Sequence, residues 1–337
     1  GNILKEMFSR IAVMILLGLI YLDVITQVEF IYYLTGAYFI RTFVMLVYAL
    51  KLYTPTFIFK LPNNYKEVFK YASYIILAGS AGAILLDIDK FMIPQKEAIA
   101  YTAYYSVGVY IASLLEAPGR AMAQIVQPIT AKALNENNQP EILKLYKSTS
   151  INLLLICGLF FLLINLNISQ GYLLIDEKYS QGIWVVLMIS IAKLYTMMLG
   201  NNGAIISNSK YYKILLPYAI AMALSVIVLN NWLISLYKMN GAALSTLIVL
   251  LFFNTIKIWY VKKKFNMLPF TKKTIYLLLI LGAIYGVFFS WDFAFHPIVN
   301  IGLKSTLISL LYLVAVYKLK ISADVNTIIN KLIKSNQ

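Results

Sequence analysis

The stretch STSINLLLICGLFFLLINLNIS, residues 148–169, contains no charged side chain. As a helix it would rise about 33 Å, enough to cross the roughly 30 Å hydrocarbon core of a bilayer. Similar apolar runs recur along the chain, and the alternating pattern of a transmembrane β-barrel is absent. We expect about ten membrane-spanning helices, over residues 8–28, 30–50, 71–93, 98–120, 148–169, 181–200, 212–232, 239–260, 273–291 and 298–318.

The composition supports an all-α polytopic membrane protein. Of 337 residues, 61% are hydrophobic and only 13% are charged, whereas soluble domains have about 25% charged residues. The chain has one cysteine, Cys157, and one histidine, His296. Because isolated residues of these types cannot form a disulfide framework or a Cys/His metal centre, we expect no cofactor, no metal and no catalytic residue.

The net charge of +15 is best explained by membrane topology rather than by nucleic-acid binding. Lysines concentrate in every second connection between the apolar runs. Cytoplasmic connections of membrane proteins carry this excess of Lys and Arg, so both ends of the chain are expected to be cytoplasmic. The lysine-rich segments are 51–70, 132–147, 210–213, 257–273 and the tail from Lys318.

An internal similarity indicates two lobes. GAYFIR, residues 36–41, begins the second apolar run, and GAALST, residues 241–246, begins the eighth. Two similar hairpins six spans apart, in the same orientation, are typical of a parallel repeat. If the second span is the sixth of its lobe, four spans would precede Gly1. The predicted parts are an N-lobe remnant (1–50), an inter-lobe linker (51–70), a C-lobe (71–260), two extra spans (261–320) and a cytoplasmic amphipathic tail (321–337).

Two segments resemble a known family. AGSAGAILLDIDKFMI, residues 78–93, and the run from Tyr105 through Pro118-Gly119-Arg120 to Ile129 are similar to spans seven and eight of polysaccharide flippases. These Wzx-like repeat-unit flippases belong to the multidrug/oligosaccharidyl-lipid/polysaccharide exporter superfamily. The resemblance implies spans five to fourteen of a 14-span, two-lobe exporter.

The resemblance also implies a function. The protein would be a transporter, not an enzyme, in a bacterial cytoplasmic (inner) membrane. It would flip an undecaprenyl-diphosphate-linked oligosaccharide from the cytoplasmic to the periplasmic leaflet for surface polysaccharide or lipopolysaccharide synthesis. Its partners would be that lipid-linked oligosaccharide, membrane lipids and a coupling cation, H⁺ or Na⁺.

Arg41 and Lys193 lie deep within apolar runs. Arg41 lies about eleven residues and Lys193 about twelve residues from the start of its apolar run, so at 1.5 Å per residue both fall near the middle of the bilayer. A charge there is costly unless it lines a polar path or is paired. Two interpretations are open: these cations bind the diphosphate in a cavity, or they form structural ion pairs or helix-packing hydrogen bonds.

Arg120 lies four residues after Glu116, which places the two side chains on one helix face. An ion pair between them and a contact from Arg120 to the substrate are both open. In the resembled family an arginine of span eight is assigned to the diphosphate. Pro118 and Gly119, which lie between the pair, should loosen or kink the helix.

Asp87 and Asp89 lie near the outer end of the third run, followed by Lys90. Either they form a site for a coupling cation, or they hold a gate by hydrogen bonds. Glu116 is a further candidate for the gate or for ion coupling.

Two other functions fit the sequence less well. A drug or organic-cation antiporter of the same superfamily would need carboxylates in its cavity, whereas the deep charges here are basic. A membrane polysaccharide polymerase or ligase would need a large outer loop for its catalytic residues, and the outer connections are short.

Overall fold

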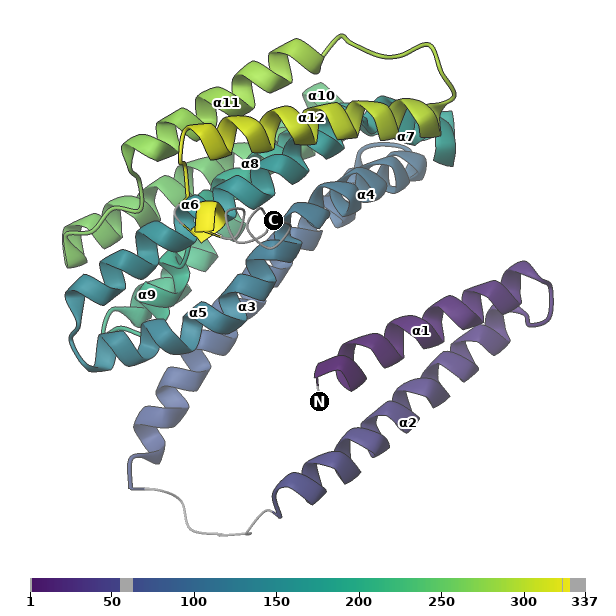
Figure 1. The fold of residues 1–337 in the computed structure, drawn as a ribbon. Coiled ribbons are helices and arrows are strands. Elements are labelled where there is room, and N and C mark those ends of the chain that lie inside the picture. The colour runs from purple at the N-terminus through teal and green to yellow at the C-terminus, as the bar shows by residue number, and fades with distance from the viewer. Residues whose placement is uncertain (1, 55–62, 323, 328–337) are drawn as a thin grey trace, which may run out of the picture. The chain divides into compact units, whose positions relative to one another are not determined.

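The computed structural model describes residues 2–54, 63–322 and 324–327, with side chains except at 2–6, 78 and 81–86. All regular elements in these ranges are helical, as the sequence predicts (Figure 1). The chain divides into two compact units, residues 1–65 and 66–337. Residues 55–62 of the predicted linker and most of the predicted tail, 323 and 328–337, lie outside the described residues.

The first unit is a helical hairpin of α1 (Asn2–Tyr21) and α2 (Gln27–Leu52). Thr26 caps α2: its hydroxyl accepts from the Glu29 backbone N–H at 3.3 Å, and its own N–H donates to the Glu29 carboxylate at 2.8 Å. This reciprocal pairing satisfies donors that the first helical turn leaves free. It therefore fixes where the second helix begins.

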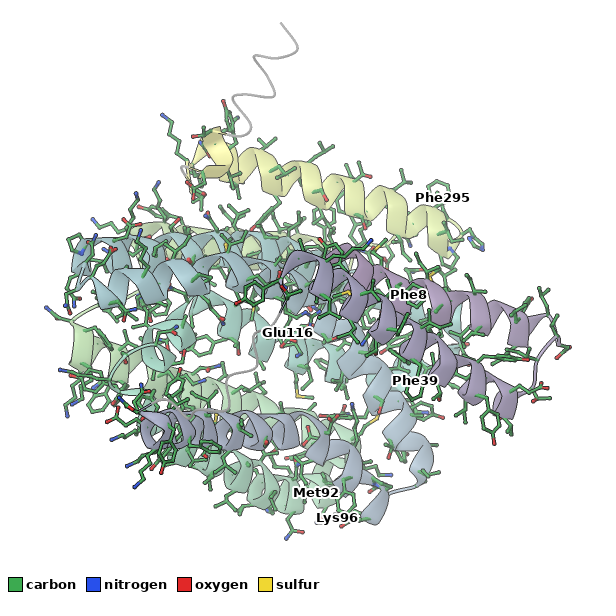
Figure 2. The ribbon with its side chains drawn as sticks, turned by 90° about the horizontal axis from the view of Figure 1, so that it is seen from below. Phe8, Phe39, Met92, Lys96, Glu116 and Phe295 are labelled. Atoms are coloured by element: carbon green, nitrogen blue, oxygen red, sulfur yellow. The ribbon has the colours of Figure 1, made fainter. Side chains whose placement is uncertain are left out.

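The second unit holds the remaining helices. Its longer elements are α3 (Tyr65–Met92), α4 (Ile99–Ser113), α5 (Ala117–Asn135), α6 (Gln139–Asn165), α8 (Ile183–Met198), α10 (Leu215–Phe265), α11 (Lys272–Phe288) and α12 (Pro297–Lys318). Its short elements are η1 (Ile93–Gln95), η2 (Leu114–Glu116), α7 (Ile168–Ile175), η3 (Glu177–Gly182), α9 (Asn202–Ser207) and η4 (Tyr212–Ile214). In Figure 2, Lys96 follows Met92 where α3 passes into η1, and Phe295 lies just before α12.

Helix α10 is a hairpin of two helices. Lys238 interrupts it with φ 54° and ψ −136°, outside the helical region. We call residues 215–237 the first limb and residues 239–265 the second limb. Gly241 lies where the limbs meet, because a Cβ on it would lie 2.0 Å from the Leu233 carbonyl oxygen. Each limb is long enough to cross a bilayer.

Five segments among the described residues are long and apolar enough to span a membrane: Gln27–Leu52, Gln139–Asn165, Glu177–Met198, Tyr212–Phe265 and Pro297–Lys318. The fourth of these contains both limbs of α10. Each of the ten predicted apolar runs overlaps a helix. The short helices α7 and α9 were not predicted, because eight and six residues are too few to show a hydrophobic period.

Helix α8 lies at the centre of the second unit, packed against α4, α6 and α10. Helix α6 also packs against α5 and α11. Helix α12 packs against both α6 and α11 (Figure 1). The helix that begins at Ile99 changes to a 3-10 turn over Leu114–Glu116 before α5 continues. This interruption lies where Pro118 and Gly119 predict a loosened or kinked helix, since proline has no N–H for the preceding turn. It places Glu116 beside α8.

Candidate functional site

The α4–α5 interruption carries a buried ion pair. Lys193 of α8 is 7% exposed, and its ammonium donates to the Glu116 carboxylate at 2.6 Å. The two residues are 77 positions apart in sequence. Of the two interpretations of Lys193, the structure shows the ion pair. Burial of Lys193 depends on Glu116, because an unpaired charge in this position would be costly.

Arg120 shares the same glutamate more weakly. Its guanidinium lies 3.7 Å from the second Glu116 oxygen, and its side chain is 67% exposed. The predicted i,i+4 pair therefore exists, but most of the Arg120 side-chain surface is exposed and can meet a ligand. One carboxylate faces two cations, so this cluster of Lys193, Glu116 and Arg120 has a formal charge of +1. An anion is the complementary ligand.

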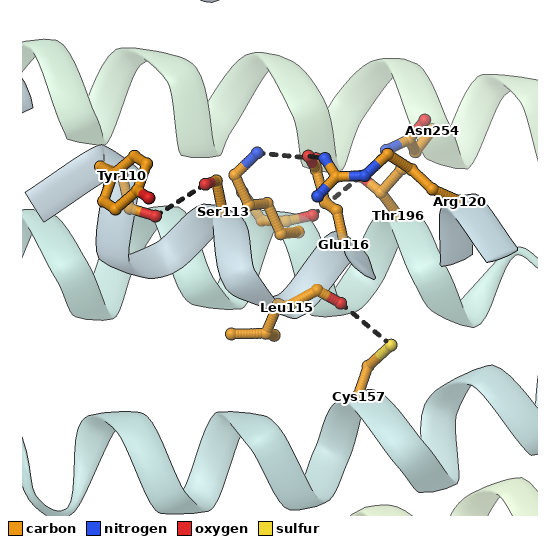
Figure 3. A network of polar contacts seen from close by, with 10 residues as sticks. Tyr110, Ser113, Leu115, Glu116, Arg120, Cys157, Thr196 and Asn254 are labelled. Atoms are coloured by element: carbon orange, nitrogen blue, oxygen red, sulfur yellow. Dashed lines mark hydrogen bonds and ion pairs between the residues drawn. The ribbon is translucent and has the colours of Figure 1, made fainter. Parts of the chain in front are cut away.

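A cavity of about 420 Å³ lies one helical turn from the cluster. Thr196 lines it and shares a face of α8 with Lys193, three residues earlier. The Thr196 hydroxyl accepts a hydrogen bond at 2.8 Å from the amide of Asn254, on the second limb of α10 (Figure 3). Lys257, one turn further along the second limb, lines the same cavity. Polar side chains thus lie both in the cluster and, one helical turn away, in the wall of the cavity.

Asp89 is the centre of a second polar site. It is 2% exposed and accepts three hydrogen bonds from neutral donors. Asn230 of the first limb donates at 2.6 Å, Thr246 of the second limb donates at 2.8 Å, and the Tyr105 hydroxyl of α4 donates to the same oxygen as Thr246. Asp89 therefore joins α3, α4 and both limbs of α10. Of the two interpretations of the aspartates, this contact fits a hydrogen-bonded gate and an ion site equally well.

Asp87 lies in a different environment from Asp89. Its side chain is 71% exposed and pairs with Lys90 at 2.8 Å. An exposed pair three residues apart on one helix contributes little to stability. The two aspartates that the sequence treats alike therefore do not form one site.

Arg41 belongs to the first unit. Its guanidinium lies 5.0 Å above the Tyr38 ring and donates to the Ser9 hydroxyl of α1 at 3.4 Å. The side chain thus bridges the two helices of the hairpin. Of the six predicted site residues, the structure brings together Lys193, Glu116 and Arg120, whereas Asp87, Asp89 and Arg41 each have other partners.

Sequence reasoning missed the partners of Asp89 and the cavity lysine. Asn230 and Thr246 are uncharged, and a search for deep charges passes over them. A search for polar residues within apolar runs would have found both. Lys257 was counted among the topology lysines, since it lies near the end of its apolar run. Its position on the cavity depends on how the limbs of α10 pack.

The fold has a known counterpart. No protein-family model and no curated protein sequence matches the chain. Among solved structures, it is similar to "Lipid II flippase MurJ, inward closed conformation", with a TM-score of 0.59 and 16% sequence identity. The match covers 94% of this chain and 67% of that chain. The chain therefore has the α-helical fold of that structure and spans about two thirds of that protein's length.

Proposed function

We propose that this chain is part of a transporter that flips an undecaprenyl-diphosphate-linked oligosaccharide from the cytoplasmic to the periplasmic leaflet of a bacterial inner membrane. The observation that carries the proposal is the net positive cluster of Lys193, Glu116 and Arg120, one turn from a cavity. A diphosphate is the anionic part of such a cargo. Similarity in fold to a protein named as a lipid II flippase supports a lipid-linked substrate.

Within this proposal the three cations have different roles. Arg120 contacts the diphosphate directly, because it is the exposed cation of its cluster. Lys193 positions Glu116 and adds to the positive potential without leaving its ion pair. Arg41, in the N-lobe remnant, is a further proposed cation for the diphosphate. Its side chain is only partly buried.

We further propose that Asp89 binds the coupling cation, H⁺ or Na⁺. Hard cations prefer oxygen ligands. Around Asp89 lie the hydroxyls of Tyr105 and Thr246 and the Asn230 side-chain oxygen, which has no hydrogen-bond partner of its own. Cation binding would replace the three donated hydrogen bonds and so change how α3, α4 and α10 are held together. Asp87 and Glu116 have no such oxygen-rich surroundings among the described contacts and are not proposed as ion sites.

Transport by the full-length protein in proteoliposomes tests the proposal, using a fluorescent lipid-linked oligosaccharide. Arg120→Gln should reduce flipping by roughly 10- to 100-fold, since a hydrogen bond to a charged group contributes about 1.5–3 kcal/mol. Lys132→Gln is the matched control. Lys132 lies on the same helix, is 75% exposed and pairs with Glu136 at i,i+4, as Arg120 does with Glu116.

The double variant Arg41→Gln/Lys193→Gln tests the deeper cations. Transport that survived in this variant and in Arg120→Gln, with the proteins folded, would contradict the proposal. Uptake of an organic cation instead of the lipid-linked cargo would favour the antiporter. Elongation or ligation of the supplied oligosaccharide would favour the polymerase or ligase.

A further inference from the structure

Lys257 is a cation near the cytoplasmic end of its apolar run, and the proposed function gives it no role. It lies on the second limb of α10, eight residues before the helix ends at Phe265, about 12 Å along the axis. None of the ion pairs among the described residues includes it. Its described interaction is with the Tyr218 ring, whose centroid lies 4.9 Å from the ammonium. A lysine at this depth without a carboxylate is expected to meet an anion from outside the protein.

Lys257 separates two cavities. One is the cavity of about 420 Å³ that Thr196 and Asn254 also line. The other, of about 240 Å³, is otherwise apolar or aromatic, with Ile214, Ile256 and Trp259 in its wall. Leu215, Tyr218 and Lys257 line both. One ammonium group therefore has a polar donor set on one side and a hydrocarbon-lined space on the other.

The residues around Lys257 indicate on which side of the membrane it lies. Lys262, Lys263 and Lys264 occupy the last turn of α10, and this lysine-rich end is predicted to be cytoplasmic. Trp259 is 58% exposed, as aromatic residues at a membrane interface are. Basic pockets between transmembrane helices on the cytoplasmic side are suited to the phosphate of anionic lipids.

We propose that Lys257 and its two cavities form a binding site for a phosphate-bearing lipid of the cytoplasmic leaflet. The ammonium of Lys257 binds the phosphate, with the amide of Asn254, one helical turn away, as a second donor. The hydrocarbon chain enters the apolar cavity beside Trp259. The lipid is either an anionic glycerophospholipid of the bilayer or a polyprenyl phosphate. The site shares the cavity of about 420 Å³ with the proposed transport function, but binding of a lipid there does not require transport and is measured separately from it.

Native mass spectrometry of the delipidated full-length protein tests this site. Phosphatidylglycerol, polyprenyl phosphate, zwitterionic phosphatidylcholine and inorganic phosphate are supplied in turn. At least one of the two anionic lipids should be retained in preference to phosphatidylcholine and inorganic phosphate, and which one is retained identifies the source. No preference for either anionic lipid would overturn the proposal.

Lipid retention by variants of Lys257 tests whether the lipid binds at this residue. Lys257→Gln should weaken retention roughly 10- to 100-fold, as expected for loss of a charged hydrogen bond, and Lys257→Arg should keep it. Lys262→Gln, an exposed lysine five residues along the same helix, is the matched control and should bind as the unaltered protein does. Equal retention in Lys257→Gln and Lys262→Gln would overturn the proposal.

A measurement on the unaltered protein covers the case in which Lys257→Gln does not fold. Acetylation of lysine side chains is followed by peptide mass spectrometry with and without the anionic lipid. Lys257 should be protected by the lipid, whereas Lys262 should react equally in both samples. Equal reaction of Lys257 in both samples would overturn the proposal.

Discussion

Asp87 and Asp89 are two residues apart on α3 and lie in opposite environments. Asp87 is exposed and paired with Lys90, whereas Asp89 is 2% exposed and accepts from three neutral donors on two other helices. A carboxylate oxygen accepts only, and an amide in its place would bring a donor against donors. The residue at position 89 therefore determines whether the donors that meet at this junction of helices have an acceptor.

Asp89→Asn should destabilise the protein by roughly 1–3 kcal/mol, because a buried donor loses its acceptor. Asp87→Asn, the matched substitution, should change stability by no more than about 0.5 kcal/mol, as exposed substitutions usually do. Thermal unfolding in detergent, followed by intrinsic fluorescence, measures both. Equal midpoints for the two variants would contradict the role assigned to Asp89.

At the scale of the element, α10 depends on the close approach of its two limbs. A Cβ at Gly241 would lie 2.0 Å from the Leu233 carbonyl oxygen and 2.8 Å from the Ile234 nitrogen. Both are backbone atoms, so no side-chain rotation can relieve the overlap. The hairpin brings Asn230 and Thr246 to the same carboxylate, and its geometry therefore controls the Asp89 site.

Gly241→Ala should destabilise the protein by about 1–3 kcal/mol, the usual cost of overpacking, or more. Gly282→Ala on α11 is the control, because a Cβ there meets nothing within 4 Å. That variant should be neutral or more stable by up to about 1 kcal/mol, since alanine favours a helix interior over glycine. Comparison of their unfolding midpoints provides the test, and a Gly241→Ala protein as stable as Gly282→Ala would refute the close approach.

For the whole molecule, the charge pattern predicts which ends of the helices face the cytoplasm. Phe295 precedes α12 and is 60% exposed, in a connection predicted to be outside. Glu136 follows α5 and is exposed, in a connection predicted to be inside. The native cysteine, Cys157, is fully buried, so labelling of introduced cysteines has little background.

A membrane-impermeant maleimide should therefore label Phe295→Cys in intact cells and Glu136→Cys only after the membrane is permeabilised. The physical reason is the preference for lysine-rich connections on the cytoplasmic side. The unaltered protein is the control for Cys157. The reverse pattern of labelling would show that the orientation is wrong.

The sequence by itself determined the helices and the class of protein. Long apolar runs such as 148–169 are local features, and each run was sufficient to predict a helix, five of the described segments being long and apolar enough to cross a bilayer. The interruption near Pro118 and the i,i+4 contact between Glu116 and Arg120 were predictable for the same reason, since both depend on neighbours along one helix.

Only the tertiary structure decided which polar groups meet. Glu116 and Lys193 are 77 residues apart, and Asp89 and Thr246 are 157 residues apart. Their pairing depends on how α3, α4, α8 and α10 pack, and many packings are compatible with the same apolar runs. The packing left Asp87 exposed, buried Asp89, paired Lys193 and left Lys257 on two cavities without a carboxylate partner among the described ion pairs. A charged residue in a membrane helix indicates that a polar partner is needed. Which residue is that partner depends on the contacts between helices.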